Sequence, residues 1–335
     1  METVRWGTLG CARVFNRRMV PGFHAAAGVA ELLAVSSRSL EKARETAAQH
    51  NIPRAYGSYE ELLADSEIDA VYIPLPNDLH AEWTIRALEA GKHVLCDKPA
   101  ALTYADARRM AETAQHRNLR LMEGFMWRHH PQHQRVRELL DSGAIGPLTH
   151  FRGAFTYPAA PDPSNIRWQK DKGGGSLLDV GVYPVNAARY FFGEEPVAVQ
   201  AVSRLDDTTG VDRHTAALLE WVDGRTASTI GGFDQVFTTR YELVGETGSI
   251  TAERAFQVGE AGVTLTIRRG DDVQTEFFPH TDQYGEEIAH FSRCVRNPEL
   301  PLSPGEDGSA QTLVVEAIHR AMHEKRRVRL NEISV

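Results

Sequence analysis

Short apolar segments alternate with helical segments through the first third of the chain, and this alternation constrains the fold more than any other feature. Residues 4–9 and 30–36 are predicted strands, followed by helices over 17–27 and 40–50. Strands that alternate with helices form βαβ units with right-handed crossovers. The sequence therefore predicts an α/β fold whose N-terminal domain is a doubly wound parallel sheet, a Rossmann domain. Further strands are predicted at 54–56, 70–73, 93–96 and 120–123, and further helices at 58–64, 80–90 and 104–117.

The pattern changes after Phe125, where longer segments of alternating polarity begin. Such alternation is typical of strands with one buried face, so the remainder is predicted to be an α+β domain on a mostly antiparallel open sheet, with helices on one face. The predicted domains are residues 1–124 and 125–335. Strands are predicted at 150–156, 197–204, 215–222, 226–232, 239–244, 249–252, 263–268 and 273–278, and helices at 132–142, 173–192 and 309–325.

Charge and cysteine content narrow the class of protein. The 335 residues carry a net charge of −8, which argues against a nucleic-acid or anionic-membrane surface. Cys11, Cys96 and Cys294 show neither CxxC nor Cys/His metal spacing, so they are predicted to be thiols in a reducing compartment. The chain has no 18-residue apolar run, and its first residues read as a strand rather than a signal peptide. A cytoplasmic protein is the expectation.

A tight turn links the first strand to the first helix. Gly10-Cys11-Ala12-Arg13-Val14-Phe15 approximates G-x-G-x-x-G, with Ala12 and Phe15 in the second and third glycine places. In that motif the first glycine makes the turn and the second place lets the backbone approach a pyrophosphate at the helix N-terminus. Its position after a strand and before a helix favours a dinucleotide site, although the string by itself also suits other strand-to-helix turns.

The end of the second strand predicts which dinucleotide binds. NAD-binding proteins usually carry a carboxylate there, but Ser36-Ser37-Arg38-Ser39 has none before Glu41. Hydroxyls with a guanidinium suit a 2′-phosphate, so NADP(H) is favoured over NAD(H). The alternative is that Arg38 is a solvated loop residue.

Two further segments carry candidate chemistry. Lys98, in Asp97-Lys98-Pro99, follows the strand at 93–96, at the sheet edge where ligands bind. The run from Gly173 to Tyr183 places Asp179 and Tyr183 four residues apart, on one helix face, which suits proton transfer at a hydroxyl. The alternatives are a surface lysine, a solvated aspartate and a core tyrosine.

These segments together resemble the Gfo/Idh/MocA family of glucose-fructose oxidoreductase and inositol dehydrogenase, over nearly the whole chain. Asp97-Lys98-Pro99 is similar to the family's E-K-P signature with Asp for Glu, and 76–80 (PNDLH) to its P-N-x-x-H segment. The segment 173–183 (GGGSLLDVGVY) is similar to its G-G-G-x-L-x-D-x-G-x-[HY] helix. Tyrosine at 183, where many members have histidine, resembles the branch of sugar ketoreductases, NADP-xylose dehydrogenases and dihydrodiol dehydrogenases.

The resemblance implies a catalytic site of Lys98, Asp179 and Tyr183. No metal is expected, because no Cys or second carboxylate completes a ligand set with the histidines at 129, 130 and 133. It implies an enzyme that transfers a hydride between NADP and a secondary alcohol or ketone, or a C1 hydroxyl, of a sugar or sugar-like polyol. A trans-dihydrodiol dehydrogenase and a non-catalytic NADP-binding sensor are the alternatives. A homodimer or homotetramer formed through the open sheet is also implied. The implied cofactor contacts are Gly10, Cys11, Ala12, Arg13, Ser37, Arg38, Leu75, Asn77, His80, Asp97, Lys98, Arg167 and Trp168.

Two other groups remain open to more than one interpretation. His129, His130 and His133 diverge at the start of a helix, so packing or substrate contact is favoured over metal binding. Tyr284 and Glu287 resemble a family segment near the cleft, but Glu287 is also placed to cap a helix.

Overall fold

The computed structural model describes residues 2–300, 302 and 305–333, and the chain divides into two compact units. The first unit comprises Met1–His129 and Asp282–Ser309, and the second comprises His130–Thr281 and Ala310–Val335. The sequence-based boundary assigned every residue from 125 onward to the second domain. In the structure, the segment that begins at Asp282 packs within the first unit instead.

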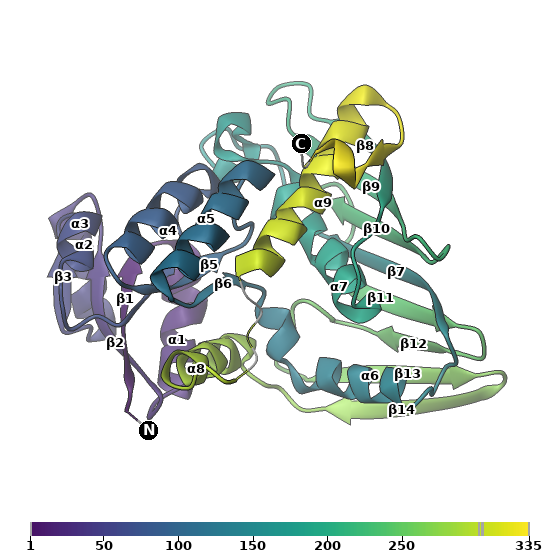
Figure 1. Cartoon of the computed structure of the whole chain (residues 1–335), viewed down its shortest axis with the longest axis horizontal. Helices are drawn as coiled ribbons and strands as arrows, with labels where there is room; N and C mark the ends of the chain where they lie inside the picture. Colours follow the sequence, from purple (N-terminus) through teal and green to yellow (C-terminus); the bar gives the residue numbers. More distant parts are fainter. Residues whose placement is uncertain (1, 301, 303–304, 334–335) are drawn as a thin grey trace. The chain divides into compact units, whose positions relative to one another are not determined.

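A six-stranded sheet forms the centre of the first unit, in the order β3-β2-β1-β4-β5-β6 (Figure 1). All of its strand pairs are parallel, which confirms the predicted doubly wound sheet. The strand order reverses between β1 and β4, and ligands of such sheets bind at the carboxyl ends of the strands beside that reversal. The strands are β1 (Val4–Leu9), β2 (Ala30–Ser36), β3 (Arg54–Tyr56), β4 (Ala70–Ile73), β5 (His93–Asp97) and β6 (Leu121–Gly124).

Helices cover both faces of this sheet. Side chains of α3, α4 and α5 bury one apolar face, and side chains of α1, α2 and α8 bury the other. Trp6 of β1 anchors the second face, because its ring lies 5.5 Å from that of Phe23 and 5.3 Å from that of Phe291. The helix α8, which follows the nine-stranded sheet's last hairpin in the chain, is therefore part of the core of this unit. The helices are α1 (Val20–Ala25), α2 (Leu40–His50), α3 (Tyr59–Leu63), α4 (His80–Glu89), α5 (Tyr104–Arg117) and α8 (Gln283–Arg296).

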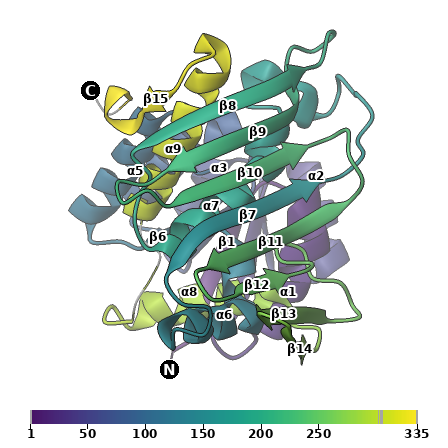
Figure 2. The same ribbon diagram turned by 90° about the vertical axis from the view of Figure 1, so that its right-hand side faces the viewer.

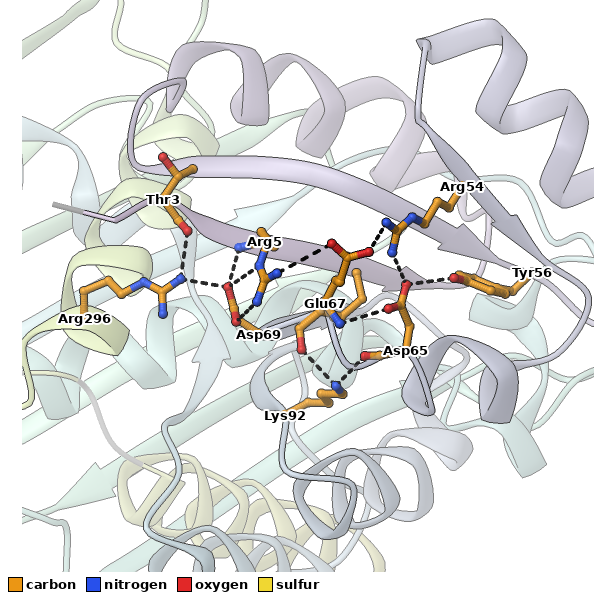
Figure 3. Close-up of polar contacts among 10 residues, drawn as sticks. Thr3, Arg5, Arg54, Tyr56, Asp65, Glu67, Asp69, Lys92 and Arg296 are labelled. Carbon is orange, nitrogen blue, oxygen red and sulfur yellow. Dashed lines mark hydrogen bonds and ion pairs between the residues drawn. The ribbon is translucent and has the colours of Figure 1, made fainter.

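An ion-pair network holds the end of α8 to the sheet (Figure 3). Asp69 accepts hydrogen bonds from Arg5 Nη2 at 2.9 Å and from Arg296 Nη2 at 2.8 Å. The same Arg296 nitrogen also donates to the carbonyl of Thr3 at 2.7 Å. These bonds join α8 to β1 and to the residue preceding β4. They lie at the amino ends of the strands, away from the edge where ligands bind.

A nine-stranded sheet forms the second unit, in the order β14-β13-β12-β11-β7-β10-β9-β8-β15 (Figure 2). β7 and β10 pair in parallel and the other pairs run antiparallel, which confirms the predicted mostly antiparallel sheet. The strands are β7 (Leu148–Thr156), β8 (Ala198–Leu205), β9 (Asp212–Glu220), β10 (Thr226–Gly232), β11 (Thr238–Gly245), β12 (Ser249–Ala252), β13 (Val263–Arg269), β14 (Asp272–Phe278) and β15 (Val328–Arg329).

One face of this sheet packs on helices. The helix α7 (Val182–Phe192) lies behind β7 and β10 in Figure 2, and Phe191 of α7 lies 5.0 Å from the ring of Tyr241. The helices α6 (Pro131–Asp141) and α9 (Gly305–Glu324) begin close to the predicted positions, 132–142 and 309–325. Within the described residues, no helix combines the length and apolar character needed to cross a membrane.

Candidate active site

The turn after β1 has the geometry of a dinucleotide cradle. Gly10 has φ +106°, and its backbone N–H donates to Ser36 O at 2.9 Å. A Cβ at this position would lie 3.0 Å from Leu75 Cδ2, so only glycine fits both the backbone angle and the space. Leu75 follows β4, so the turn sits at the reversal of strand order. Cys11 and Ala12, which follow in this turn, are half-buried, at the place where the motif brings a pyrophosphate near the backbone.

The first helix begins differently from the prediction. Residues Phe15–Met19 form a π-helical turn that continues into α1, rather than an α-helix over 17–27. Phe15 is fully buried and serves as a core anchor, a role that the glycine of the motif cannot fill. Ala12 O accepts a hydrogen bond from Asn16 N at 3.1 Å, so helical bonding starts at Ala12. Cys11 is half-buried beside this turn, and Arg13 is exposed.

Ser37 and Arg38 follow β2 at the same edge. Ser37 is buried, and its hydroxyl accepts a hydrogen bond from Ser39 N at 3.3 Å. Arg38 is exposed and lies near Tyr59, whose pKa is raised by burial although the charge of Arg38 opposes this shift. A guanidinium with neighbouring hydroxyls fits a 2′-phosphate. Tyr59 could not be identified from the sequence, because its position beside Arg38 depends on contact between α3 and the end of β2.

His80 joins two of the predicted ligand-binding turns. It is 1% exposed, with Nδ1 2.7 Å from Pro99 O and Nε2 2.8 Å from Leu75 O. Both ring nitrogens are thus engaged by carbonyl groups of the chain. The ring holds the turn after β4 to the turn after β5. Asn77, in the short 3-10 helix Asn77–Leu79 between them, is half-buried.

Lys98 lies in a turn that is fixed at several points. The Asp97 carboxylate accepts a hydrogen bond from Lys98 N at 2.9 Å, and the Lys98–Pro99 peptide bond is cis. Two residues on, Ala100 N donates to the buried Glu123 at 2.8 Å. The turn therefore leaves the carboxyl end of β5 on a defined path, with the half-buried Lys98 at its start.

A buried carboxyl group lies behind Asp97. Glu287 is 2% exposed, and burial, followed by the charge of Asp97, raises its pKa well above the usual value. Tyr72 hydrogen-bonds Asp97, and its pKa is likewise raised by burial and then by Asp97. The alternative that Glu287 caps a helix is wrong, since Asp282 accepts hydrogen bonds from the first amides of α8, Tyr284 N at 3.1 Å and Gly285 N at 3.3 Å.

In the second unit, Asp179 and Tyr183 lie on one continuous helix. Asp179 belongs to a π-helical turn, Leu177–Gly181, and Tyr183 to the first turn of α7. Asp179 Oδ2 accepts hydrogen bonds from Tyr157 Oη at 2.7 Å and from Arg167 Nε at 2.9 Å. Tyr183 is 6% exposed, and its ring lies 5.2 Å from that of Phe155. The helix thus carries a carboxylate fixed by two donors, four residues before a phenol held among aromatic rings.

Aromatic packing supports the residues around Asp179. Trp168, predicted to contact the cofactor, is 3% exposed and lies 5.3 Å from the ring of Phe233. Tyr157 lies 5.3 Å from the same ring, and burial, with Asp179 next, raises its pKa. The sequence analysis missed Tyr157 as a site residue. Its only signal was its position directly after the strand predicted at 150–156.

Other candidates from the sequence have packing roles. Asn186, seven residues after Asp179 on the same helix, donates to Gln311 at 3.3 Å and is fully buried. His133 faces Tyr241 Oη at 2.8 Å and Ala255 O at 2.9 Å, and burial, with His130 next, lowers its pKa to about 3. In the described part of the chain, no three His, Cys, Asp or Glu residues are grouped to hold a metal ion.

The predicted site residues are thus divided between the units. The first unit holds the cradle, Ser37, Arg38, Leu75, Asn77, His80, Asp97 and Lys98, and the second holds Arg167, Trp168, Asp179 and Tyr183.

Comparison with known proteins covers both units. Residues 4–125 match an oxidoreductase family with an NAD-binding Rossmann fold, and residues 133–251 match the GFO/IDH/MocA C-terminal domain. A dTDP-3,4-didehydro-2,6-dideoxy-alpha-D-glucose 3-reductase of Actinomadura kijaniata is 38% identical over 94% of both chains. A D-xylose 1-dehydrogenase (NADP(+)) of Haloferax volcanii is 36% identical over 94% of this chain and 96% of the relative.

A solved structure resembles the whole chain. The 3-ketoreductase KijD10 of Actinomadura kijaniata, crystallised with NADP and TDP-benzene, has a TM-score of 0.88 and 37% identity, over 96% of this chain and 98% of its own. Both halves of the chain, and the motifs that predicted them, match one family. The chain belongs to the GFO/IDH/MocA family of oxidoreductases.

Proposed function

We propose that this chain is an NADP-dependent oxidoreductase that interconverts a hydroxyl and a carbonyl group on a sugar or a sugar-like polyol. The observation that carries the proposal is the fixed carboxylate of Asp179 four residues before Tyr183, in a chain that also has the Gly10 cradle and Arg38. Support comes from relatives named as an NADP-dependent xylose dehydrogenase and a reductase of a dTDP-linked keto-sugar. These activities share one chemistry, hydride transfer at a sugar carbon.

The first unit is proposed to hold the cofactor. Gly10 and Ala12 admit the pyrophosphate to the helix N-terminus, and Ser37 and Arg38 bind the 2′-phosphate. Asp97 and Lys98 lie at the carboxyl end of β5, where the nicotinamide end of the cofactor is proposed to bind. Bound NADP(H) supplies or accepts the hydride.

Three side chains are proposed to act on the substrate oxygen. Tyr183 gives a proton to that oxygen in reduction and takes one in oxidation. The Lys98 ammonium is proposed to stabilise negative charge that develops on the substrate. Asp179, fixed by Tyr157 and Arg167, accepts a hydrogen bond from a substrate hydroxyl and so orients the sugar. Proton transfer by a positioned side chain typically contributes about 10²–10⁴-fold to the rate.

Titration with NADPH and with NADH, followed by tryptophan fluorescence, tests the cofactor. We expect NADPH to bind about 10- to 100-fold more tightly, because charge-assisted bonds to the 2′-phosphate are lost with NADH. Arg38→Gln should remove most of this preference. Equal affinity for the two nucleotides would overturn the assignment of Arg38.

A screen of aldoses and keto-sugars with NADP(H) tests the activity. Tyr183→Phe should then lower kcat by about 10²-fold or more, and Lys98→Ala should do the same, with NADPH affinity retained by the tyrosine variant. Wild-type rates in both variants would remove these residues from the mechanism.

The assembly proposed is a homodimer or homotetramer in the cytoplasm. Its support is the open nine-stranded sheet of the second unit, on whose strands and loops several apolar side chains are exposed. The three cysteines are thiols, as in proteins of reducing compartments. Light scattering on the purified protein tests the assembly, and a monomeric mass would refute it. The apolar side chains are Val202 (70% exposed), Val222 (83%), Val236 (79%) and Phe277 (65%).

A further inference from the structure

The helix that carries Asp179 and Tyr183 starts on a buried carboxylate from another element. Asp212, the first residue of β9, is 4% exposed. Its Oδ2 accepts hydrogen bonds from Ser176 Oγ at 2.6 Å and from the backbone N–H of Leu177 at 2.8 Å. A third bond comes from Thr215 Oγ1 at 2.7 Å. Asp212 therefore binds both the side chain and the main chain at the first helical residues.

Both hydroxyl groups donate to Asp212 rather than to their other neighbours. Ser176 Oγ also lies 3.2 Å from Gly231 O, and Thr215 Oγ1 lies 3.7 Å from Met322 Sδ. Each hydroxyl has a single hydrogen, and in both cases Asp212 is the nearer acceptor. Hydrogen bonds to an ionised carboxylate are also stronger than bonds between neutral groups.

Gly175, the last glycine of the run at 173–175, leaves free the space that this carboxylate occupies. Gly175 has φ +115°, and a Cβ there would lie 2.0 Å from Asp212 Oδ1. No side chain fits in that space. The glycine run of the motif is therefore a docking place for Asp212 and not only a flexible lead into the helix.

The anchored turn is connected directly to the site. Gly175 O accepts a hydrogen bond from Asp179 N at 3.1 Å, and Leu177 O accepts one from Val182 N across the π-helical turn. One turn further, a Cβ at Gly231 would lie 2.6 Å from Gly181 Cα, so the helix backbone rests directly on β10. Because Asp179 N is hydrogen-bonded to Gly175, a shift of the neighbouring Ser176 and Leu177 would also shift Asp179.

We propose that Asp212 is a positioning residue, whose carboxylate sets the start of this helix and so places Asp179 and Tyr183 for reaction. The inference rests on the proposed function, because it assigns the purpose of the placement to catalysis. A misplacement of about 1 Å at a reacting group can lower the rate by about 10²-fold. Asp212 itself acts only through the helix.

Asp212→Asn tests the proposal, because asparagine keeps the shape and removes the charge that holds three donors. We expect kcat to fall about tenfold or more, with NADPH affinity within about twofold of wild type. Hydrogen exchange of the peptide covering residues 173–186 should accelerate in the same variant. This second readout does not depend on turnover. If the wild-type protein proves inactive, the proposed function is refuted, but hydrogen exchange still tests whether Asp212 anchors the helix.

Asp206→Asn is the matched control. Asp206 is 7% exposed, and its Oδ1 likewise accepts three hydrogen bonds, from Thr208 N at 3.1 Å, Thr209 N at 2.9 Å and Thr209 Oγ1 at 2.9 Å. These bonds close its own loop and do not reach the helix. We expect wild-type kcat and wild-type exchange over 173–186.

Thr215→Val keeps the proposal testable if the asparagine variant does not fold. It removes one of three donors and should lower kcat by about two- to fivefold, a partial effect in the same direction. Unchanged kcat and unchanged exchange in Asp212→Asn, or equal losses in Asp212→Asn and Asp206→Asn, would overturn the proposal.

Discussion

Each unit of this protein buries a carboxyl group near its part of the candidate site, and the two groups differ in the hydrogen-bond donors around them. Asp212 of the second unit is surrounded by donors, three of which reach one oxygen. Glu287 of the first unit has an Oε1 with no hydrogen-bond partner in the described part of the chain. Burial is the main cause that raises the pKa of Glu287 well above its usual value, and the negative charge of Asp97 is the second.

The difference shows that the donors around a buried carboxyl group, and not burial alone, decide what the group does. Donors replace the hydrogen bonds of water, so a carboxylate such as Asp212 can tie segments together. Without donors, a buried carboxyl group stays protonated and resembles an apolar side chain. Four substitutions, ordered by expected effect, test this contrast.

Asp212→Ala should have the largest effect. It leaves a backbone amide and two hydroxyl groups buried without their acceptor, and we expect the free energy of unfolding to fall by about 3–5 kcal/mol. Urea denaturation followed by tryptophan fluorescence measures this change. A loss below about 1 kcal/mol would mean that water takes the place of the carboxylate.

Glu287→Gln should have the opposite sign. Because the pKa of Glu287 is raised in the folded state, the folded protein binds a proton that the unfolded chain releases above its own pKa, and stability falls as the pH rises past that value. Glutamine removes this dependence. We expect the variant to be more stable than wild type at pH 8 and nearly equal to it at pH 4.

The neighbouring Glu286, which is exposed on the same helix, is the control for this experiment. Glu286→Gln should leave the pH dependence of stability unchanged. A gain of stability at pH 8 that appears in both variants would reflect overall charge and not the buried carboxyl group.

Asp69→Asn should show the reverse pH dependence within the same unit. Burial alone would raise the pKa of Asp69, but hydrogen bonds from Arg5 and the charge of Arg296 outweigh it and lower the pKa. This stabilisation is present above the unfolded pKa and is lost as the pH falls through the folded pKa. We expect a loss of about 1–2 kcal/mol at pH 7 and almost none in strong acid. Glu45→Gln, at an exposed position of α2, should change neither value.

Asp206→Asn should have the smallest effect. The pKa of Asp206 is lowered chiefly by the hydrogen bond from Thr209 N, but asparagine still offers one oxygen to the same donors. We expect a loss of at most about 1 kcal/mol, seen as a small shift in thermal midpoint. A loss as large as that of Asp212→Ala would show that three donors alone, wherever they lie, determine the cost.

Much of the fold could be predicted from local pattern. The six strands of the first sheet and eight of the nine in the second match predicted segments, because alternating polarity and βαβ spacing are local properties. β15 was missed, since Val328–Arg329 is too short to show a period. The helix α8 was not among the predicted helices, and its place in the first unit depends on packing against Trp6, which joins residues nearly 300 positions apart.

The candidate site was predicted unevenly. Gly10, Arg38, Lys98, Asp179 and Tyr183 lie in contiguous motifs with a known mechanism, so sequence reasoning reached them. The residues that lie against them come from elements distant in sequence and belong to no motif of their own. These residues are Tyr59, Tyr157 and Asp212. His80 shows the same limit, because its spacing identified it but only the structure shows both ring nitrogens bound to carbonyl groups.

The sequence by itself determined the fold class and the family, and it predicted which residues carry reactive chemistry, because each of these follows from short-range spacing. Only the tertiary structure decided which groups hold those residues in place and which buried carboxyl groups find donors. The physical reason is that hydrogen bonding and desolvation depend on the distance between elements in space. Asp212 and Glu287 are both acidic residues in the sequence, and only the atoms packed around them surround one with hydrogen-bond donors and raise the pKa of the other.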